Sequence, residues 1–187
     1  MMNENLINKA IKVATKAHEG QYRKGNKLPY IVHPMECGLI AAGMTDDPEV
    51  VAAAILHDTL EDTILDYSDL VSDFGSNVAD MVLSVSENKR KDKPESETWK
   101  IRKQESLEHY RALDTETKIV LLADKLSNMR SMKEDYGVMG DGLWQKFNQK
   151  DKNEHKWYYG SLGRVLKELD STDEYKEYME LYCAIFV

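Results

Sequence analysis

Apolar residues recur at helical spacing, three or four positions apart, along almost the whole chain. Runs of β-branched residues that alternate in period two between turn residues, the pattern of strands, are missing from the sequence. A first helix is predicted over residues 6–17, ending near Gly20, because glycine commonly follows the end of a helix. A second is predicted over residues 33–43, where Pro34 suits the first helical position. The pattern predicts an all-α protein.

The third predicted helix covers residues 48–62 and is almost continuously apolar over 50–56, so we expect it to lie buried at the centre of the fold. Two short helices are expected on either side of a break at Gly75. The remaining elements are predicted as a charged loop over 87–96, helices over 97–113 and 115–135, and two helices from Trp144 to the C-terminus, split near 170–172.

Length and composition favour one domain over residues 1–187. The chain has a formal net charge of −8 and 42% hydrophobic residues, which is sufficient for a core without disulfides. Cys37 and Cys183 lie far apart and outside any CxxC spacing, so both are expected as reduced, mostly buried thiols. Residues 1–5 lack the layout of a secretory signal, and no apolar run approaches the ~18 residues of a membrane span, so we expect a cytoplasmic protein that does not enter membranes.

The charge is unevenly distributed. Residues 87–104 hold seven basic and four acidic residues, and residues 16–27 also carry a net charge of +3. An acidic protein lacks the broad basic face that nucleic acids require, so no nucleic-acid partner is expected. Two basic islands fit a small, highly charged anion better, with Lys100 and Lys103 as candidates for phosphate contact.

Polar chemistry concentrates at the end of the predicted central helix, where His57 and Asp58 follow the apolar run and Glu61 and Asp62 come one turn later. At about 100° per residue, these four side chains fall within a sector of about 140°, which can line a pocket. Imidazole and carboxylate together suit a divalent ion such as Mn²⁺, Fe²⁺ or Zn²⁺, and the later acids can take a proton from water beside it. The alternative is an acidic helix end in which His57 is a hydrogen-bonded core histidine.

Two distant segments favour the metal interpretation. His33 begins the second predicted helix, and Asp124 sits inside an apolar stretch, where a carboxylate requires a cation. Asn128, about 40° around the helix, shares the face of Asp124, whereas Arg130, near about 240°, points elsewhere as a solvated or structural cation. Among the other histidines, His18 is expected to form a structural hydrogen bond, and His109 and His155 to lie at the surface.

These residues reproduce the H…HD…D pattern of the HD-domain metal phosphohydrolases. More narrowly, the chain resembles the hydrolase domain of the RelA/SpoT homologues, and among those the single-domain, Mesh1-like small alarmone hydrolases. The matching segments span about two-thirds of the chain and are 17–24 (AHEGQYRK), 29–34 (PYIVHP), 56–63 (LHDTLEDT) and 122–130 (LADKLSNMR). Ser127 departs from the pattern, since family members often carry a larger aromatic residue or His there, and this leaves guanine specificity open.

The resemblance implies an HD-domain helical bundle that hydrolyses the 3′-pyrophosphate of (p)ppGpp to give GDP or GTP and pyrophosphate. It implies one Mn²⁺, or in its place Fe²⁺, Co²⁺ or Zn²⁺, bound by His33, His57, Asp58 and Asp124, with Glu61 and Asp62 positioning or deprotonating the attacking water. Substrate contacts are implied for Arg23, Lys24, Asn128 and Tyr158, the last with an aromatic core contact as its alternative.

Two other functions stay open on the sequence alone. The same site could serve an HD phosphohydrolase of another nucleotide, such as a nicotinamide dinucleotide phosphate or a nucleoside phosphate. A non-catalytic domain that binds an alarmone or a metal is a third possibility, although such a domain has no need of Glu61 and Asp62 as a water-activating pair.

Overall fold

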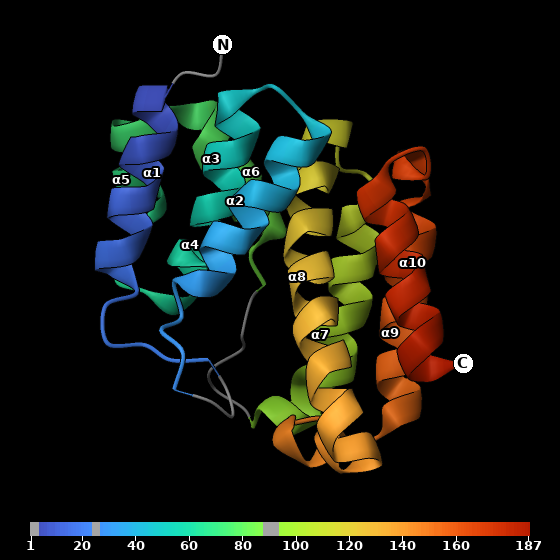
Figure 1. Ribbon diagram of the computed structural model, residues 1–187. Coiled ribbons are helices and arrows are strands. Elements are labelled where there is room, and N and C mark those ends of the chain that lie inside the picture. The colour runs from blue at the N-terminus through green and yellow to red at the C-terminus, as the bar shows by residue number, and fades with distance from the viewer. Residues whose placement is uncertain (1–3, 24–26, 88–93) are drawn as a thin grey trace.

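The structure is a computed structural model that describes residues 4–23, 27–87 and 94–187. These residues form helices and no strand, with one isolated β-bridge between Tyr22 and Pro29 (Figure 1). The all-α prediction is confirmed. Lys24 and most of the predicted charged loop lie outside the described residues.

The helices follow one another through short connections. In chain order they are α1 (Glu4–Ala17), α2 (Val32–Met44), α3 (Pro48–Leu56), α4 (Thr59–Asp62), α5 (Tyr67–Phe74), α6 (Ser76–Val85), α7 (Glu95–Tyr110), α8 (Thr115–Met139), the 3-10 helix η1 (Gly140–Lys146), α9 (Lys152–Val165), the 3-10 helix η2 (Lys167–Leu169) and α10 (Asp173–Phe186).

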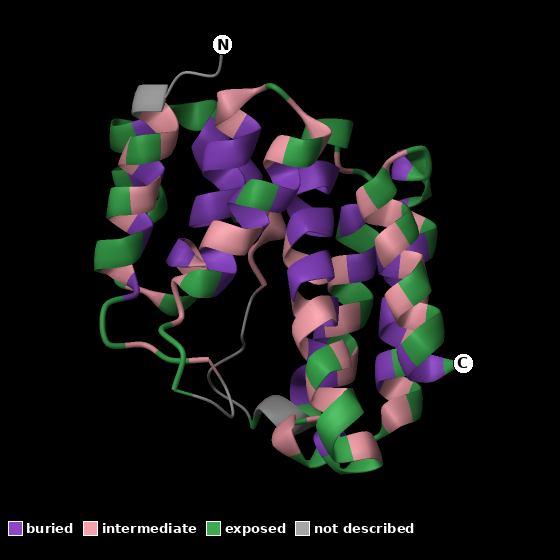
Figure 2. Cartoon of the chain, in the orientation of Figure 1, coloured by how far each residue is buried: buried purple, intermediate pink, exposed green. Residues whose placement is uncertain are grey.

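Helix α3 is the central element of the fold. It begins at Pro48, and the preceding Asp47 caps it by accepting a hydrogen bond from the backbone N–H of Glu49 at 2.8 Å. Residues 50–56 are all buried, which confirms their predicted place in the core. The helix contacts α1, α2, α6 and α8, and the buried residues gather along it and along the adjoining part of α8 (Figure 2).

The predicted continuous helix over 48–62 is wrong, because α3 ends at Leu56 and α4 begins only at Thr59. At the break, side chains bind backbone carbonyls in the last turn of α3. Thr59 Oγ1 donates to Leu56 O at 2.7 Å, and His57 Nδ1 lies 2.9 Å from Ala54 O. His57 and Asp58 therefore occupy a turn between two helices rather than one helical face.

Helix α8 joins the two sides of the molecule. It packs against α2, α3 and α6 on one side and against α10 on the other, while α9 packs on α7 and α10 (Figure 1). It continues past the predicted end at residue 135 to Met139, since Gly137 is accommodated in the helix and the left-handed Gly140 (φ 53°) follows the last turn.

The C-terminal region differs from the prediction in three details. Trp144 belongs to η1, and the first of the two expected helices begins only at Lys152. His155 is buried rather than at the surface, because its ring packs against Trp144 and Phe147 and its Nε2 lies 2.8 Å from Gln149 O. Cys183 is exposed, whereas Cys37 is buried as expected.

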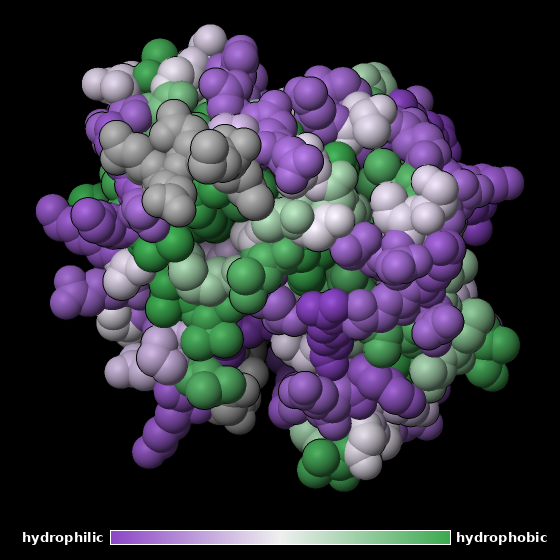
Figure 3. Space-filling model, turned by 45° about the horizontal axis from the view of Figure 1, so that its top comes forward, coloured by the Kyte–Doolittle hydropathy of each residue, from purple (hydrophilic) through white to green (hydrophobic). Residues whose placement is uncertain are grey.

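In the described part of the chain, the model contains no helix with the length and apolar character required to cross a bilayer. Hydrophilic side chains prevail around the edge of the face shown in Figure 3, with apolar side chains nearer its middle.

Helices α2 and α3 approach closely at Gly38, where an added Cβ would stand 2.5 Å from Ile55 Cγ1. We predict that Gly38→Ala lowers the free energy of unfolding by about 1–3 kcal/mol, measured by urea denaturation, because a packed core resists an extra methyl group. Gly137→Ala is the control: nothing lies within 4 Å of its added Cβ, so helix propensity should raise stability by about 0.5–1 kcal/mol. Equal effects of the two variants would contradict this packing.

Candidate functional site: a cluster of two histidines and two aspartates

Four side chains from three separate segments converge where α2, the turn after α3, and α8 meet. His33 is in the first turn of α2, His57 and Asp58 form the turn before α4, and Asp124 lies in the middle of α8. His33 Nε2 stands 3.3 Å from Asp124 Oδ1 and 3.7 Å from Asp58 Oδ2. His57 Nε2 stands 2.9 Å from Asp58 Oδ2 and 3.7 Å from Asp124 Oδ1. The residues predicted as metal ligands are thus neighbours.

These separations fit one divalent cation. Donor atoms bound at about 2.0–2.2 Å from a single ion stand about 2.8–3.6 Å apart at octahedral or tetrahedral angles. The four contacts fall between 2.9 and 3.7 Å. A set of two imidazole nitrogens and two carboxylate oxygens is also a donor set that Mn²⁺, Fe²⁺ and Zn²⁺ accept.

The imidazole of His57 faces the cluster with the correct nitrogen. Its Nδ1 is 2.9 Å from the carbonyl of Ala54, an acceptor only, so Nδ1 carries a proton when the ring is neutral and Nε2 offers its lone pair to the cluster. Among the described residues, this buried Nε2 forms no well-aligned hydrogen bond, although it stands 2.9 Å from Asp58 Oδ2. A buried polar atom of this kind calls for a ligand, and a cation among the four side chains would supply one.

Both carboxylates of the cluster are ionised. Burial alone would raise the pKa of Asp124, but the ammonium of Lys125 and the nearby imidazoles hold that pKa well below its usual range. The pKa of Asp58 is likewise lowered, since the His57 and His33 imidazoles outweigh its burial. In turn, Asp58 and Asp124 overcome the burial of His57 and raise the pKa of its imidazole to about 9. The cluster attracts positive charge.

Further groups hold the two aspartates in place. The Tyr30 hydroxyl donates to Asp58 Oδ2 at 2.5 Å, and Asn128 Nδ2 donates to Asp124 Oδ1 at 2.5 Å. Lys125 Nζ binds the other oxygen of Asp124 at 2.5 Å. The sequence signals for Tyr30 and Lys125 were present in the segments 29–34 and 122–130, but neither residue was singled out, because a side chain that supports a ligand has no characteristic spacing.

Cys37 also touches the cluster. His33, Cys37 and His57 form a group whose possible ligand atoms lie within 4.8 Å of one another. Burial raises the pKa of the Cys37 thiol well above its usual range, and the thiolate is the form that binds metal. Its sulfur lies 3.7 Å from His33 Nδ1 and 3.9 Å from His33 Nε2, so Cys37 packs against the imidazole about equally far from both nitrogens.

Glu61 and Asp62, the acidic pair, follow the cluster directly on helix α4. The backbone N–H of Asp62 donates to Asp58 O at 2.9 Å, which places the acidic pair one turn beyond His57 and Asp58. Glu61 Oε2 accepts from the backbone of Glu87, and the carbonyl of Asp62 accepts from Gln21 Nε2. His18 forms the expected structural bond, with its Nδ1 2.9 Å from Gln21 Oε1.

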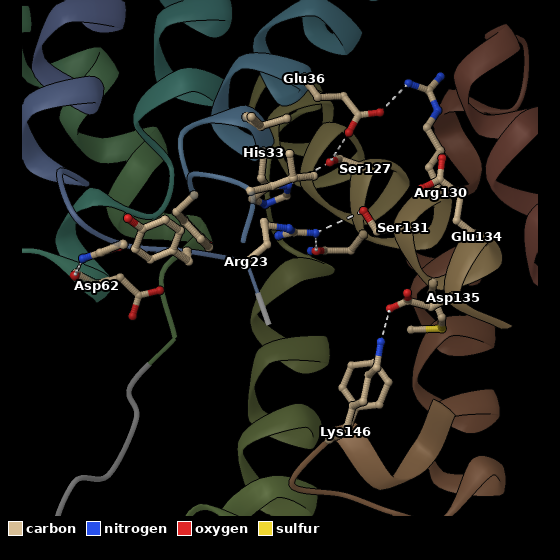
Figure 4. A pocket seen from close by; sticks show the side chains of 18 of the residues that line it. Arg23, His33, Glu36, Asp62, Ser127, Arg130, Ser131, Glu134, Asp135 and Lys146 are labelled. Carbon is tan, nitrogen blue, oxygen red and sulfur yellow. Dashed lines mark hydrogen bonds and ion pairs between the residues drawn. The ribbon is translucent and has the colours of Figure 1, made fainter. Parts of the chain in front are cut away.

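A cavity of about 970 Å³ opens beside the cluster (Figure 4). His33 and Asp62 line it, and so do two residues predicted to contact substrate. One of these, Arg23, reaches across it, with Nη2 3.4 Å from Asn128 Oδ1 and 3.2 Å from Ser131 Oγ. Since Asn128 also binds Asp124, the Arg23 guanidinium is linked to the cluster through a single side chain.

The other predicted substrate contacts come from α7 and α9. Lys103 binds Glu87 at 3.1 Å and lies over the ring of Tyr158, whose buried hydroxyl has no hydrogen-bond partner in the described residues. Burial, with smaller contributions from Glu87, Asp124 and Glu61, raises the pKa of Tyr158 to about 12. Lys100 instead pairs with Glu154 and lies 3.5 Å over the ring of Trp157.

Sequence reasoning did not find Glu87. Its carboxylate accepts from Arg102, Lys103 and Ser106 of α7, while its backbone N–H reaches Glu61 at 3.0 Å. The sequence showed Glu87 only as one acid among many bases. Arg130, predicted to be a solvated or structural cation, pairs with Glu36 and Glu177, and it also lines the cavity.

With the all-α bundle and the H…HD…D geometry described, a family model for the HD domain matches residues 10–140. The chain belongs to the HD domain family.

Among its relatives is the protein of Xenopus tropicalis named guanosine-3′,5′-bis(diphosphate) 3′-pyrophosphohydrolase MESH1, which is 37% identical over 131 residues, 68% of this chain and 70% of the relative. The bifunctional (p)ppGpp synthase/hydrolase SpoT of Escherichia coli (strain K12) is 38% identical over 131 residues, 67% of this chain but 18% of the relative. The chain therefore spans less than a fifth of that longer protein.

Solved structures show the same architecture. A crystal structure from Listeria monocytogenes EGD-e superposes with a TM-score of 0.71 at 31% identity, covering 84% of this chain and 96% of that one. A structure described as a metazoan ortholog of SpoT that hydrolyzes ppGpp superposes with a TM-score of 0.79 over 98% of this chain and 97% of that one. The latter is 22% identical and supports the fold.

The geometry of the cluster predicts stabilisation by a divalent ion. At about 100 times its Kd, Mn²⁺ should raise the free energy of unfolding by about 2.7 kcal/mol, because only the folded chain presents the four donors together. Asp124→Asn should abolish this gain, whereas Asp173→Asn, which removes an exposed carboxylate on α10, should retain it. Thermal denaturation of each protein with and without Mn²⁺ measures the difference. An equal gain in Asp124→Asn would contradict binding at the cluster.

Proposed function

We propose that this chain is a Mn²⁺-dependent hydrolase that removes the 3′-pyrophosphate of (p)ppGpp, releasing GDP or GTP and pyrophosphate. The observation that carries the proposal is that the Nε2 atoms of His33 and His57 each lie within 3.7 Å of both Asp58 and Asp124, beside an acidic pair and a cavity. The names of the similar proteins support it. We further propose that residues 1–187 act as one domain in the cytoplasm.

The proposed reaction adds water across the bond between the ribose 3′-oxygen and phosphorus. The water gives up a proton, and the 3′-oxygen leaves the phosphorus and gains one. A Mn²⁺ ion held by His33, His57, Asp58 and Asp124 would supply a Lewis acid that lowers the pKa of water and neutralises phosphate charge. Glu61 and Asp62, one turn beyond the ligand pair, are the carboxylates suited to orient the water and accept its proton.

The cationic groups around the cavity would hold the substrate. The Arg23 guanidinium is a fork donor suited to phosphate oxygens, and Asn128 would orient it and the ribose. Lys24 belongs to the same proposed contact set. Lys103 on α7 and the buried Tyr158 hydroxyl on α9 would meet the departing pyrophosphate, with Lys100 as a further contact from α7.

A second candidate substrate is another nucleotide, such as a nicotinamide dinucleotide phosphate. The small side chain of Ser127 lines the cavity where a larger residue is common in the family, and this leaves space for a different base. A domain that only binds alarmone is disfavoured by the two carboxylates on α4, which serve no purpose in binding an anion.

The proposal predicts that purified protein with Mn²⁺ converts ppGpp to GDP and pyrophosphate in equal amounts, as measured by anion-exchange chromatography. Asp62→Asn and Glu61→Gln should lower kcat by about 10²–10⁴-fold while Mn²⁺ binding is retained, because they remove proton transfer and leave the ligands intact. Intact ppGpp in an assay that cleaves another nucleotide would overturn the substrate assignment. Full activity in both variants would remove the acidic pair from the mechanism.

A further inference from the structure

A line of polar contacts runs from His33 of the cluster to Glu177 on the C-terminal helix, and Figure 4 shows its part from Ser127 through Glu36 to Arg130. His33 Nδ1 lies 2.7 Å from Ser127 Oγ, and Ser127 Oγ donates to Glu36 Oε2 at 2.7 Å. The other oxygen of Glu36 accepts from Arg130 Nη1 at 3.0 Å. Arg130 forms a bidentate ion pair with Glu177 on α10, with hydrogen bonds from Nε at 2.7 Å and from Nη2 at 2.6 Å. The line connects α2, α8 and α10.

The direction of each hydrogen bond follows from chemistry. An ionised carboxylate only accepts, so the single hydroxyl proton of Ser127 is committed to Glu36. The Ser127 oxygen can then only accept from the ring of His33, which requires the proton of the neutral imidazole to be on Nδ1. The lone pair of that imidazole is consequently on Nε2, the nitrogen that stands 3.3 Å from Asp124 and 3.7 Å from Asp58.

The two histidines are oriented by different means. His57 is oriented by a backbone carbonyl within its own turn, which no substitution of a side chain can remove. His33 depends on Ser127, whose side chain is completely buried, and on Glu36 behind it. The neighbouring Cys37 thiol, 3.7 Å from His33 Nδ1, is a weak acceptor at most. Ser127 is therefore the one strong partner of that nitrogen among the described residues.

Arg130 and Glu177 fix the far end of this line. The bidentate pair with Glu177 orients the guanidinium, and the guanidinium binds one oxygen of Glu36 while the other faces Ser127. Glu177 is on α10, beyond residues 10–140 that match the HD domain family. A residue outside the matched region therefore helps to hold Arg130, which in turn binds Glu36.

We propose that Ser127 and Glu36 are positioning residues that hold His33 in the tautomer and orientation required to bind the metal, with Arg130 and Glu177 supporting Glu36. The inference rests on the proposed function in one respect, because it takes His33 to be a metal ligand. Removing a hydrogen-bond partner from a ligating histidine commonly costs 10–100-fold in metal affinity.

The test compares Mn²⁺ affinity across a graded series. Ser127→Ala should weaken Mn²⁺ binding by about 10–100-fold, Glu36→Gln less, and Glu177→Gln least, as measured by isothermal titration calorimetry. Ser127→Thr keeps the hydroxyl and should restore affinity to within about threefold. Ser161→Ala, which removes a buried serine hydroxyl from α9, is the matched control and should leave affinity unchanged.

A second readout separates this inference from the metal site itself. In metal-free protein, ¹⁵N NMR of the His33 side chain should show the Nδ1-protonated tautomer in the wild type and in Ser127→Thr, and a mixture in Ser127→Ala. If the wild type bound no Mn²⁺ yet showed this pattern, the metal site would fail and the positioning role would stand. Unchanged Mn²⁺ affinity and an unchanged tautomer in Ser127→Ala would overturn the inference.

Discussion

Two ionised carboxylates, Asp58 and Asp124, lie between the central helix and α8 with only 17% and 14% of their side-chain surface exposed. Negative charges in such a place are unfavourable unless cations and hydrogen-bond donors surround them. The chain supplies Lys125, Tyr30 and Asn128 as partners, and the imidazoles of His33 and His57 lie within 3.7 Å of both carboxylates. The arrangement of α2, α3 and α8 is what brings these groups together.

The break between α3 and α4 contributes to this arrangement. Within one continuous helix, His57 and Asp58 would point about 100° apart. At the break both residues keep right-handed dihedral angles and both reach the cluster, while His57 Nδ1 faces the carbonyl of Ala54 and the acids of α4 begin one turn later. The sequence predicted the correct residues for the wrong local reason, because periodicity cannot distinguish a helix from two helices joined by a turn.

The sequence was sufficient for the elements whose pattern is strong. The apolar run over 50–56 and the carboxylate of Asp124 inside an apolar stretch located the centre of the fold and the cluster before any coordinates. It was not sufficient for contacts between distant surfaces. The Ser127–Glu36 contact joins two polar residues 91 positions apart, and neither has a periodicity or neighbour that indicates the other. His155 was misplaced for the same reason, since its burial depends on η1 folding over it.

The most direct test of this account is the position of the bound ion. Crystals grown with Mn²⁺ and measured at the manganese absorption edge would locate it by anomalous scattering. The account predicts one peak at about 2.1–2.3 Å from His33 Nε2, His57 Nε2 and one oxygen each of Asp58 and Asp124. A peak bound elsewhere on the chain, or none among these four side chains at saturating Mn²⁺, would contradict it.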